Sequence, residues 1–315
     1  MKSPVMICGF KRPEALCRVL DAVRDAGVTK VYLVLDAPRP NREDDLSGYN
    51  ECVRIFDSIN WQCEVKRNYA ESNMGCGRRM TSGISWVFEH EDRAIILEDD
   101  CVPHPSFFRF CDELLERYKD DGRVGMIAAE CEHFHKNRMD FYGDSYYFDR
   151  MCLVWGWATW ARAWKLHDPL LNAVDRMVET NAMLNIFHKR RYVQQWTKNI
   201  MKIKSGQKNT WAAAWATTLY RENMLVAHSV ANPVVNIGQG ESSREGMRPA
   251  AFLSPGESNR IAEEIAFPLQ HPVTMIPNYE CEQLCLRDTL YRSPWRKMLS
   301  NPCLAIRRFW ENVCG

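Results

Sequence analysis

Residues 94–108 read AIILEDDCVPHPSFF, an apolar run that ends in three consecutive carboxylates. The run Ala94–Leu97 is continuously apolar, which is typical of a strand buried on both faces of a parallel sheet. The three acids therefore fall at the carboxyl end of that strand, and Pro105 opens a helix after it. Ligands of open α/β sheets bind outside the carboxyl ends of the strands, so we expect functional side chains at this edge.

Three similar units precede this strand along the chain. Val5–Cys8 and Val31–Leu35 read as buried strands, and Trp61–Val65 alternates in polarity as a third. Each is followed by a segment with apolar residues at helical spacing. This alternation predicts the α/β class, with a central, mostly parallel sheet flanked by helices.

The pattern after residue 100 is mixed. A further strand at Val124–Ala129 and an antiparallel one at Tyr146–Phe148 precede helices near 174–187, 190–204 and 211–222 and short strands within 225–237. We expect one domain over residues 1–250 and a C-terminal extension over 251–315. Residues 287–315 carry six basic and two acidic side chains, which indicates a solvated terminal helix or, alternatively, a peripheral contact with a membrane surface.

Composition and charge exclude several classes of protein. The chain has 315 residues, of which 46% are hydrophobic and 26% charged, so it is globular rather than disordered. A net charge of +1 gives no global field for nucleic acid. No apolar run approaches the roughly 18 residues of a membrane helix, and the first ten residues read as a strand rather than a signal peptide. We expect a soluble cytoplasmic protein, with a peripheral position at the inner face of the membrane as the alternative.

Cysteine and tryptophan are both frequent. The thirteen cysteines are scattered and odd in number, which favours free buried thiols over a disulfide framework. Seven of the eleven tryptophans lie between Trp155 and Trp215, a density that suits core packing or a pocket wall that stacks on rings.

The acidic triplet predicts a metal site. Adjacent carboxylates repel one another at a strand end unless a positive group compensates them, and a divalent cation can do so. Oxygen ligands favour Mg²⁺ or Mn²⁺ over zinc. The alternative is an acidic turn that caps the helix beginning at Pro105.

Other strand ends carry polar groups to the same edge. The sequence FKRP follows the first strand, and Asp36 follows the second. The loop NMGCGRR, residues 73–79, precedes a helix, and its glycines allow close backbone approach while helix N-termini attract phosphate. We expect these groups to converge on one rim.

Five segments in this order resemble the GT-A class of nucleotide-sugar glycosyltransferases, especially the bacterial family-2-like group labelled hemolytic-protein-like. They are FKRPE, LVLDAPR, NMGCGRR, ILEDDCVPHPSFF and YYFDRMCLVWGWATWARAW, and the resemblance runs from Val5 to Gly246. The segment EDD with its following proline and Phe-Phe pair is also similar to N-acetylglucosaminyltransferases of the same fold. The resemblance implies metal-dependent transfer of a sugar from a nucleoside-diphosphate donor, most simply a UDP-sugar, to a hydroxyl of a surface glycan.

The resemblance also implies roles for single residues. Asp100 would bind the Mn²⁺ or Mg²⁺ that bridges the sugar diphosphate. Glu98 and Asp99 would face sugar and ribose, and Arg12 and Asp36 would contact base and ribose. From motifs and resemblance together we expect the donor to contact eight residues, namely Phe10, Arg12, Asp36, Asn73, Gly75, Arg78, Glu98 and Asp99.

Tryptophans would form the acceptor side. Trp157 has the small neighbours Gly156 and Ala158, which let a ligand approach, and Trp211 begins the run TWAAAW. We therefore expect Trp157 and Trp211 to contact the acceptor. Trp160 and Trp164 are four residues apart and favour burial on one helical face.

The catalytic base is the main departure from the family pattern. Relatives often carry an aspartate after the first tryptophan of a W-D-x-x-W helix, and this chain has Ala212 there. Glu130, Glu132 or Glu241 could accept the proton instead, of which we select Glu130. The alternatives are a catalytically silent nucleotide-sugar-binding subunit and a sugar nucleotidyltransferase. His133 and His135 read as a loop pair rather than zinc ligands.

Overall fold

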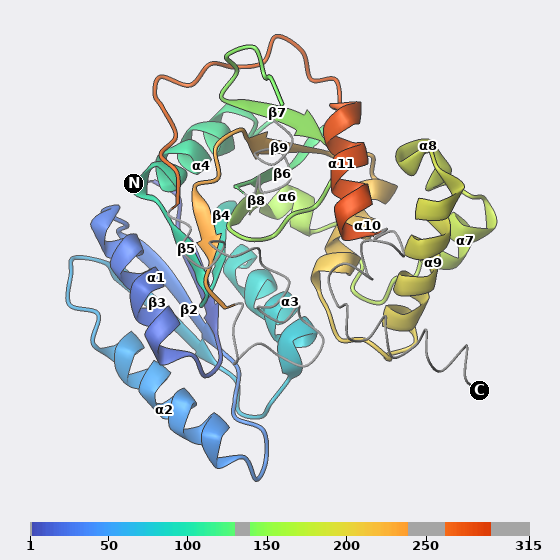
Figure 1. Ribbon diagram of the computed structural model, residues 1–315. Helices are drawn as coiled ribbons and strands as arrows, with labels where there is room; N and C mark the ends of the chain where they lie inside the picture. The colour runs from blue at the N-terminus through green and yellow to red at the C-terminus, as the bar shows by residue number, and fades with distance from the viewer. Residues whose placement is uncertain (1, 130–138, 239–261, 291–315) are drawn as a thin grey trace, which may run out of the picture.

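A computed structural model describes residues 2–129, 139–238 and 262–290 of the chain. Within them, eight strands form one sheet in the order β3-β2-β1-β4-β8-β6-β9-β7 (Figure 1). Four neighbouring pairs are parallel, and the pairs that β8 makes with β4 and β6 and that β7 makes with β9 are antiparallel. The strands of this sheet are β1 Val5–Gly9, β2 Lys30–Leu35, β3 Glu64–Tyr69, β4 Arg93–Glu98, β6 Val124–Ala128, β7 Tyr146–Asp149, β8 Trp157–Trp160 and β9 Leu225–Ser229.

The prediction of a central, mostly parallel sheet flanked by helices is confirmed. The third strand begins at Glu64 rather than Trp61, because the indole N–H of Trp61 donates to the carbonyl of Val28 at 3.2 Å and the ring packs against the core. A small second sheet pairs β5 Cys101–Pro103 with β10 Val234–Asn236.

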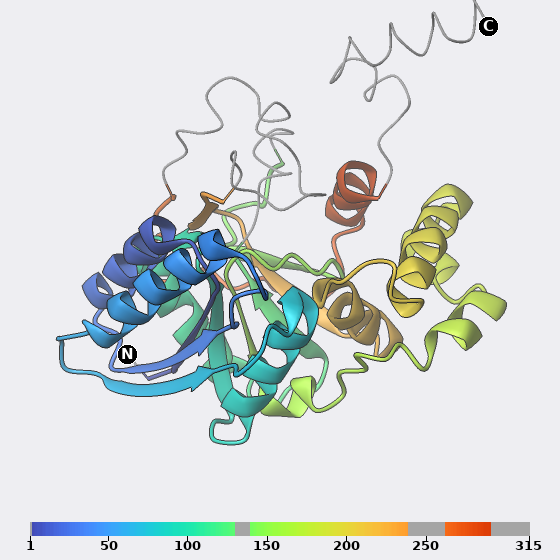
Figure 2. The same ribbon diagram turned by 90° about the horizontal axis from the view of Figure 1, so that it is seen from below.

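Helices cover both faces of the sheet. One face packs against α1 Pro13–Asp25, α2 Glu43–Asp57 and α4 Pro105–Arg117. The other packs against α3 Gly75–Phe88, α6 Ala161–Trp164 and α10 Ala212–Arg221. Seen from below, the strands lie between α1 and α2 on one side and α3 on the other (Figure 2).

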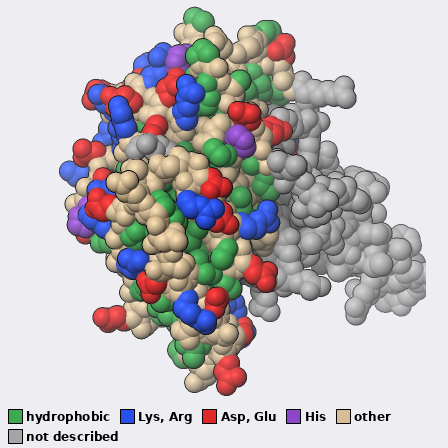
Figure 3. All heavy atoms as spheres, turned by 90° about the vertical axis from the view of Figure 1, so that its left-hand side faces the viewer, with side chains coloured by type: hydrophobic (Ala, Val, Ile, Leu, Met, Phe, Trp, Pro, Cys, Tyr) green, Lys and Arg blue, Asp and Glu red, His purple; other side chains and the backbone are tan. Residues whose placement is uncertain are grey.

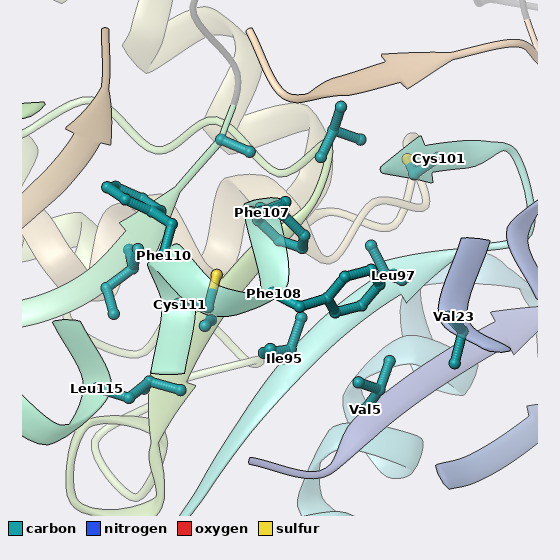
Figure 4. Close-up of a cluster of buried hydrophobic side chains, with 14 of the residues drawn as sticks. Val5, Val23, Ile95, Leu97, Cys101, Phe107, Phe108, Phe110, Cys111 and Leu115 are labelled. Carbon is teal, nitrogen blue, oxygen red and sulfur yellow. The ribbon is translucent and has the colours of Figure 1, made fainter. Parts of the chain in front are cut away.

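The core beneath the acidic triplet is built from aromatic and aliphatic side chains. Phe107 and Phe108 of α4 are fully buried, with ring centroids 5.5 Å apart in an edge-to-face arrangement. They pack near Ile95 and Leu97 of β4 (Figure 4). Burying one such side chain contributes about 1.5–3 kcal/mol, so the chain on either side of the acids is firmly anchored.

A second group of helices lies beside the sheet. It comprises α7 Val174–Glu179, α8 Leu184–Phe187, α9 Arg190–Lys204 and α11 Tyr279–Thr289, which share one hydrophobic cluster with α10. The helix expected over 174–187 is interrupted, and Asn181 there has a φ of 51°, which ends regular helix. Glu282 of α11 accepts two hydrogen bonds at 2.7 Å from the guanidinium of Arg150, next to β7.

Basic and acidic side chains are interspersed over the face shown in Figure 3. All ten cysteines within the described ranges are free, as expected, and six of them are buried. Of the helices in those ranges, none has the length and apolar character that crossing a membrane requires.

Candidate functional site

Arg12 joins the ends of two neighbouring strands. It follows β1, and its Nη1 donates to Oδ2 of Asp100 at 2.5 Å while its Nη2 donates to Oδ1 of Asp99. Oδ2 of Asp99 also accepts from the backbone N–H of Phe10 at 3.2 Å. The two carboxylates are buried, whereas the Arg12 side chain is 28% exposed. Arg12, Asp99 and Asp100 form what we call the arginine–aspartate cluster.

The cluster lies where the order of the sheet reverses. From β1 the chain runs through α1 to β2 on one side, whereas β4 lies on the other side of β1, with Cys8 opposite Glu98. Such a reversal opens a crevice at the carboxyl ends of the strands, where open α/β sheets bind their ligands. The side chains that meet at this position are therefore the candidate site.

Burial and charge act in opposite directions on the cluster. Burial raises the pKa of Asp99, and Arg12 only partly offsets that rise. Burial alone would lower the pKa of Arg12, but the charges of Asp99 and Asp100 raise it well above its ordinary value. Arg12 thus stays charged and the two acids are held together by it.

Asp100 was expected to bind a metal, and its surroundings do not fit one. The positive charge that the sequence analysis assigned to a cation is supplied by Arg12, which occupies an oxygen of each aspartate. Among the described residues, no three His, Cys, Asp or Glu side chains are grouped so that they could hold a metal ion.

Gly238 closes over the cluster. A Cβ atom at this position would lie 2.0 Å from Oδ2 of Asp100 and 2.5 Å from Nη1 of Arg12, so only glycine fits. The preceding residue, Ile237, donates its backbone N–H to the carbonyl of Asp100 at 2.8 Å. No motif in the sequence signals the approach of Gly238 to Asp100, which lies 138 positions earlier in the chain.

Asp36 holds the start of α3. Its carboxylate accepts backbone N–H bonds from Met74 and Gly75, each at 2.9 Å, and from Ala37 at 3.0 Å. The amide of Asn73 adds a fourth contact at 3.3 Å. Asp36 is 3% exposed. The contact to base and ribose expected of it is replaced in this structure by bonds within the chain.

The side chain of Asn209 contacts the glycine loop, residues 73–79. Its Oδ1 accepts the backbone N–H of Gly77 at 3.0 Å, and a Cβ at Gly77 would lie 2.1 Å from that oxygen. A Cβ atom at Gly75, whose φ is +74°, would lie 2.6 Å from Nδ2 of the same side-chain amide. The close backbone approach that the glycines allow is therefore made by Asn209 rather than left open to a phosphate. Nothing in the local sequence signals this contact across 132 residues.

Three further expected donor residues, Phe10, Arg78 and Glu98, lie directly after β1, in the first turn of α3 and at the end of β4, respectively. Arg78 is exposed on the first turn of α3, where its Nε donates to the carbonyl of Met74 at 3.1 Å. Phe10 is half-buried, and its ring centroid lies 5.9 Å from the guanidinium of Arg39. Glu98 is half-buried at the end of β4.

The two tryptophans expected to contact an acceptor lie in the core. Trp157 is 1% exposed and Trp211 is 4% exposed, and their rings stack with centroids 5.4 Å apart. Trp157 belongs to β8, between β4 and β6, where Ala158 pairs with both neighbouring strands. Gly156 lies against Val234, whose Cγ2 is 2.6 Å from where a Cβ atom of Gly156 would be, so neither small neighbour leaves an opening for a ligand. Trp160 and Trp164 pack on opposite faces of the sheet rather than on one helix.

Several expected residues lie outside the described residues. Glu130, Glu132 and Glu241 are among them, as are His133 and His135 and most of the basic C-terminal segment. Ala212, where relatives hold an acid, is half-buried at the start of α10.

No family model matches the chain, and no curated protein matches it. Among solved structures, a mannosyltransferase from Pyrobaculum calidifontis in complex with GDP-Man and Mn²⁺ is 11% identical, with 70% of this chain and 69% of that chain covered and a TM-score of 0.37. A UDP-glucose pyrophosphorylase complexed with UDP-glucose is 8% identical over 73% and 90%, with a TM-score of 0.37. Mouse xyloside xylosyltransferase 1 is 13% identical over 69% and 81%, with a TM-score of 0.29. Likeness at this level decides neither substrate nor reaction.

Proposed function

We propose that the protein is a GT-A-like glycosyltransferase that binds a nucleoside-diphosphate sugar at the arginine–aspartate cluster and transfers the sugar to a hydroxyl acceptor. The observation that carries the proposal is the position of this cluster at the reversal of strand order, where a crevice binds ligands in α/β sheets of this kind. A UDP-sugar is the donor that the sequence resemblance favours.

Cations on the rim suit a diphosphate. Arg12 uses two of its N–H groups on the aspartates, and a guanidinium has five, so donors remain for phosphate oxygens. Arg78 adds an exposed, forked cation at the start of α3. Positioned donors of this kind stabilise the charge that develops on a departing diphosphate.

The remaining rim residues suit the nucleoside and the sugar. Phe10 offers a half-exposed aromatic face for a base, and Glu98 offers a carboxylate that can accept from hydroxyl groups. Asp36 and Asn209 act as positioning residues, because they fix the loop that carries Arg78.

We assign proton removal from the acceptor to Glu130. β6 lies parallel to β4, since both are antiparallel to β8, and so its carboxyl end lies at the same edge as the cluster. Glu130 follows β6 by two residues along the chain. A carboxylate near the acceptor hydroxyl is the group that an inverting transfer needs.

Isothermal titration with UDP-glucose, UDP-N-acetylglucosamine and GDP-mannose, each with and without Mn²⁺, tests donor binding. We expect one of them to bind, and Arg78→Ala to weaken that binding about tenfold, in line with the loss of a charge-assisted contact. Lys165→Ala removes an exposed cation from α6's C-terminal cap and serves as the matched control. Absence of binding by every nucleotide sugar at millimolar concentration contradicts the proposal.

A second candidate function is binding without transfer. It is favoured by Ala212, which leaves no acid at the position where relatives hold one. Release of free sugar or of a glycosylated acceptor from the bound donor distinguishes the two functions, since a silent subunit binds the donor and returns it unchanged.

A further inference from the structure

Residues of α9, α10 and α11 line a cavity of about 250 Å³. These three helices lie on the right of Figure 1. Apolar side chains from all three helices line the cavity, among them Trp196, Ile200, Ile203, Ala213, Ala216 and Leu286. An apolar cavity of roughly 150 Å³ stays dry and accepts a benzene-sized molecule. This one is larger, and its lining suits a longer apolar body.

A cation stands at the lining of the cavity. Lys208 and Thr210, from the loop between α9 and α10, are among the residues that line it. The Lys208 side chain belongs to an exposed residue and has no acidic partner in the part of the chain that the structure describes. A ligand with an anionic group next to its apolar part would therefore be complemented at both ends.

The wider charge pattern favours the same kind of ligand. From Thr180 to Arg221 the chain carries eight Lys or Arg residues and no Asp or Glu. Within the described ranges, Lys198 and Lys202 of α9 have no acidic partner either, whereas Lys204 pairs with Asp175 at 2.6 Å. Of Lys198, Lys202 and Lys208, Lys208 alone lines the cavity, and the excess of cations over this stretch attracts anions and discriminates against cations.

The cavity adjoins the candidate donor site. Asn209 stands between Lys208 and Thr210 in the sequence, and it accepts the N–H of Gly77 on α3. One loop thus contacts the glycine turn through its central residue and lines the cavity through the residues on either side.

We propose that this cavity binds the aliphatic chain of an anionic amphiphile, with its phosphate or carboxylate at Lys208. This binding site is inferred from the cavity and its charges alone, independently of the proposed function. Only its use as the acceptor site, with the head group near the rim, rests on the proposed function.

Alkyl phosphates of increasing length, used below their micelle concentration, test the site by isothermal titration. Each buried methylene raises affinity roughly fourfold, so we expect a steady gain from hexyl to octyl phosphate and a plateau once the cavity is filled. Inorganic phosphate alone and octanol alone should bind at least tenfold more weakly than octyl phosphate. Equal affinity for hexyl and octyl phosphate would overturn the proposal.

Variants separate the two halves of the site. Ala216→Leu fills the cavity and should reduce octyl phosphate affinity at least tenfold, and Ala213→Val is a milder filling variant if the first fails to fold. Lys208→Gln should weaken octyl phosphate about tenfold without changing octanol binding, and Lys165→Gln is the matched control. Unchanged octyl phosphate affinity in a folded filling variant contradicts the site. The titrations contain no nucleotide sugar, so their failure leaves donor binding unaffected, and failure of donor binding leaves them unaffected.

Discussion

At the scale of single residues, Arg12 determines how the candidate site is built. It compensates two buried carboxylates that would otherwise repel each other at neighbouring positions. Removing one partner of a buried pair costs about 3–5 kcal/mol, because the charge that remains is buried and unpaired. Partial exposure of Arg12 moderates that cost.

Arg12→Ala should lower the free energy of unfolding by about 2–4 kcal/mol at pH 7. Burial raises the pKa of Asp99 even with Arg12 present, so the folded state binds a proton more readily than the unfolded chain. The stabilisation that the protonated Asp99 gives the folded state is complete below the pKa of about 3.9 that the group has in the unfolded chain. It is lost as the pH rises through the higher pKa of Asp99 in the folded state. Urea unfolding should therefore show a smaller deficit at pH 5 than at pH 7, and a deficit that grows on acidification contradicts this account.

The same substitution should change the response to metal. With Arg12 removed, two adjacent carboxylates lack a cation, and Mn²⁺ can take its place. We expect Mn²⁺ binding, read from its electron paramagnetic resonance signal, to appear in Arg12→Ala and to vanish again in Arg12→Ala with Asp100→Asn. Equally tight Mn²⁺ binding by the unsubstituted protein without nucleotide would show that Arg12 does not compete with a metal.

At the scale of elements, backbone N–H groups at the start of α3 donate to side chains from other parts of the chain. Met74 and Gly75 donate to Asp36 after β2, and Gly77 donates to Asn209 before α10. Buried backbone donors without partners cost about 1–3 kcal/mol, so these contacts fix the loop firmly.

Asp36→Asn should lower the free energy of unfolding by about 1–3 kcal/mol, since an amide cannot accept on both sides as a carboxylate does. Asp57→Asn, which touches an exposed ion pair with Arg67, should change it by less than about 1 kcal/mol. Thermal denaturation of both variants gives the comparison. Equal losses of stability in the two variants would show that Asp36 contributes no more to stability than an exposed acid does.

Trp211→Ala tests whether the tryptophans of β8 and α10 form core or pocket. The ring is buried against Trp157, so its removal should cost about 3–5 kcal/mol. A pocket wall open to solvent would lose far less stability and more acceptor affinity. Chemical denaturation of the variant and of the unsubstituted protein separates the two outcomes, and a loss below about 1 kcal/mol would contradict a core position.

The sequence-based predictions succeeded where periodicity carries the information. The runs Val5–Cys8 and Val31–Leu35 became β1 and β2, and the carboxyl-end rule brought Arg12 to the same edge as the acidic triplet. Periodicity does not show which side chains meet when they are distant in the sequence, as Arg12 and Asp99 are at 87 residues apart. A cation was therefore inferred where Arg12 stands, and Trp157 was expected to face a ligand although it lies in the core.

At the scale of the whole molecule, a buried ion pair attaches α11 to the sheet. Glu282 is fully buried and Arg150 is half-buried, with its side chain 14% exposed, and the two side chains make two contacts at 2.7 Å. Burial raises the pKa of Glu282, and the charge of Arg150 opposes that rise.

Glu282→Ala should destabilise the protein by about 3–5 kcal/mol, because Arg150 is left without its partner. Hydrogen exchange should accelerate most in residues 279–289. Since α11 also forms one wall of the cavity, octyl phosphate affinity should fall with it. Unchanged exchange in α11 would mean that other contacts hold this helix.

The position of β8 has a consequence for synthesis on the ribosome. The four strands β3, β2, β1 and β4 come from one continuous stretch ending at Glu98, whereas β8, which covers the free edge of β4, begins only at Trp157. At about 5–20 residues per second, the 58 intervening residues, 99–156, take roughly 3–12 s to add. During that interval the nascent chain presents an unpaired apolar strand edge, which is the kind of surface that chaperones bind and that neighbouring nascent chains can join.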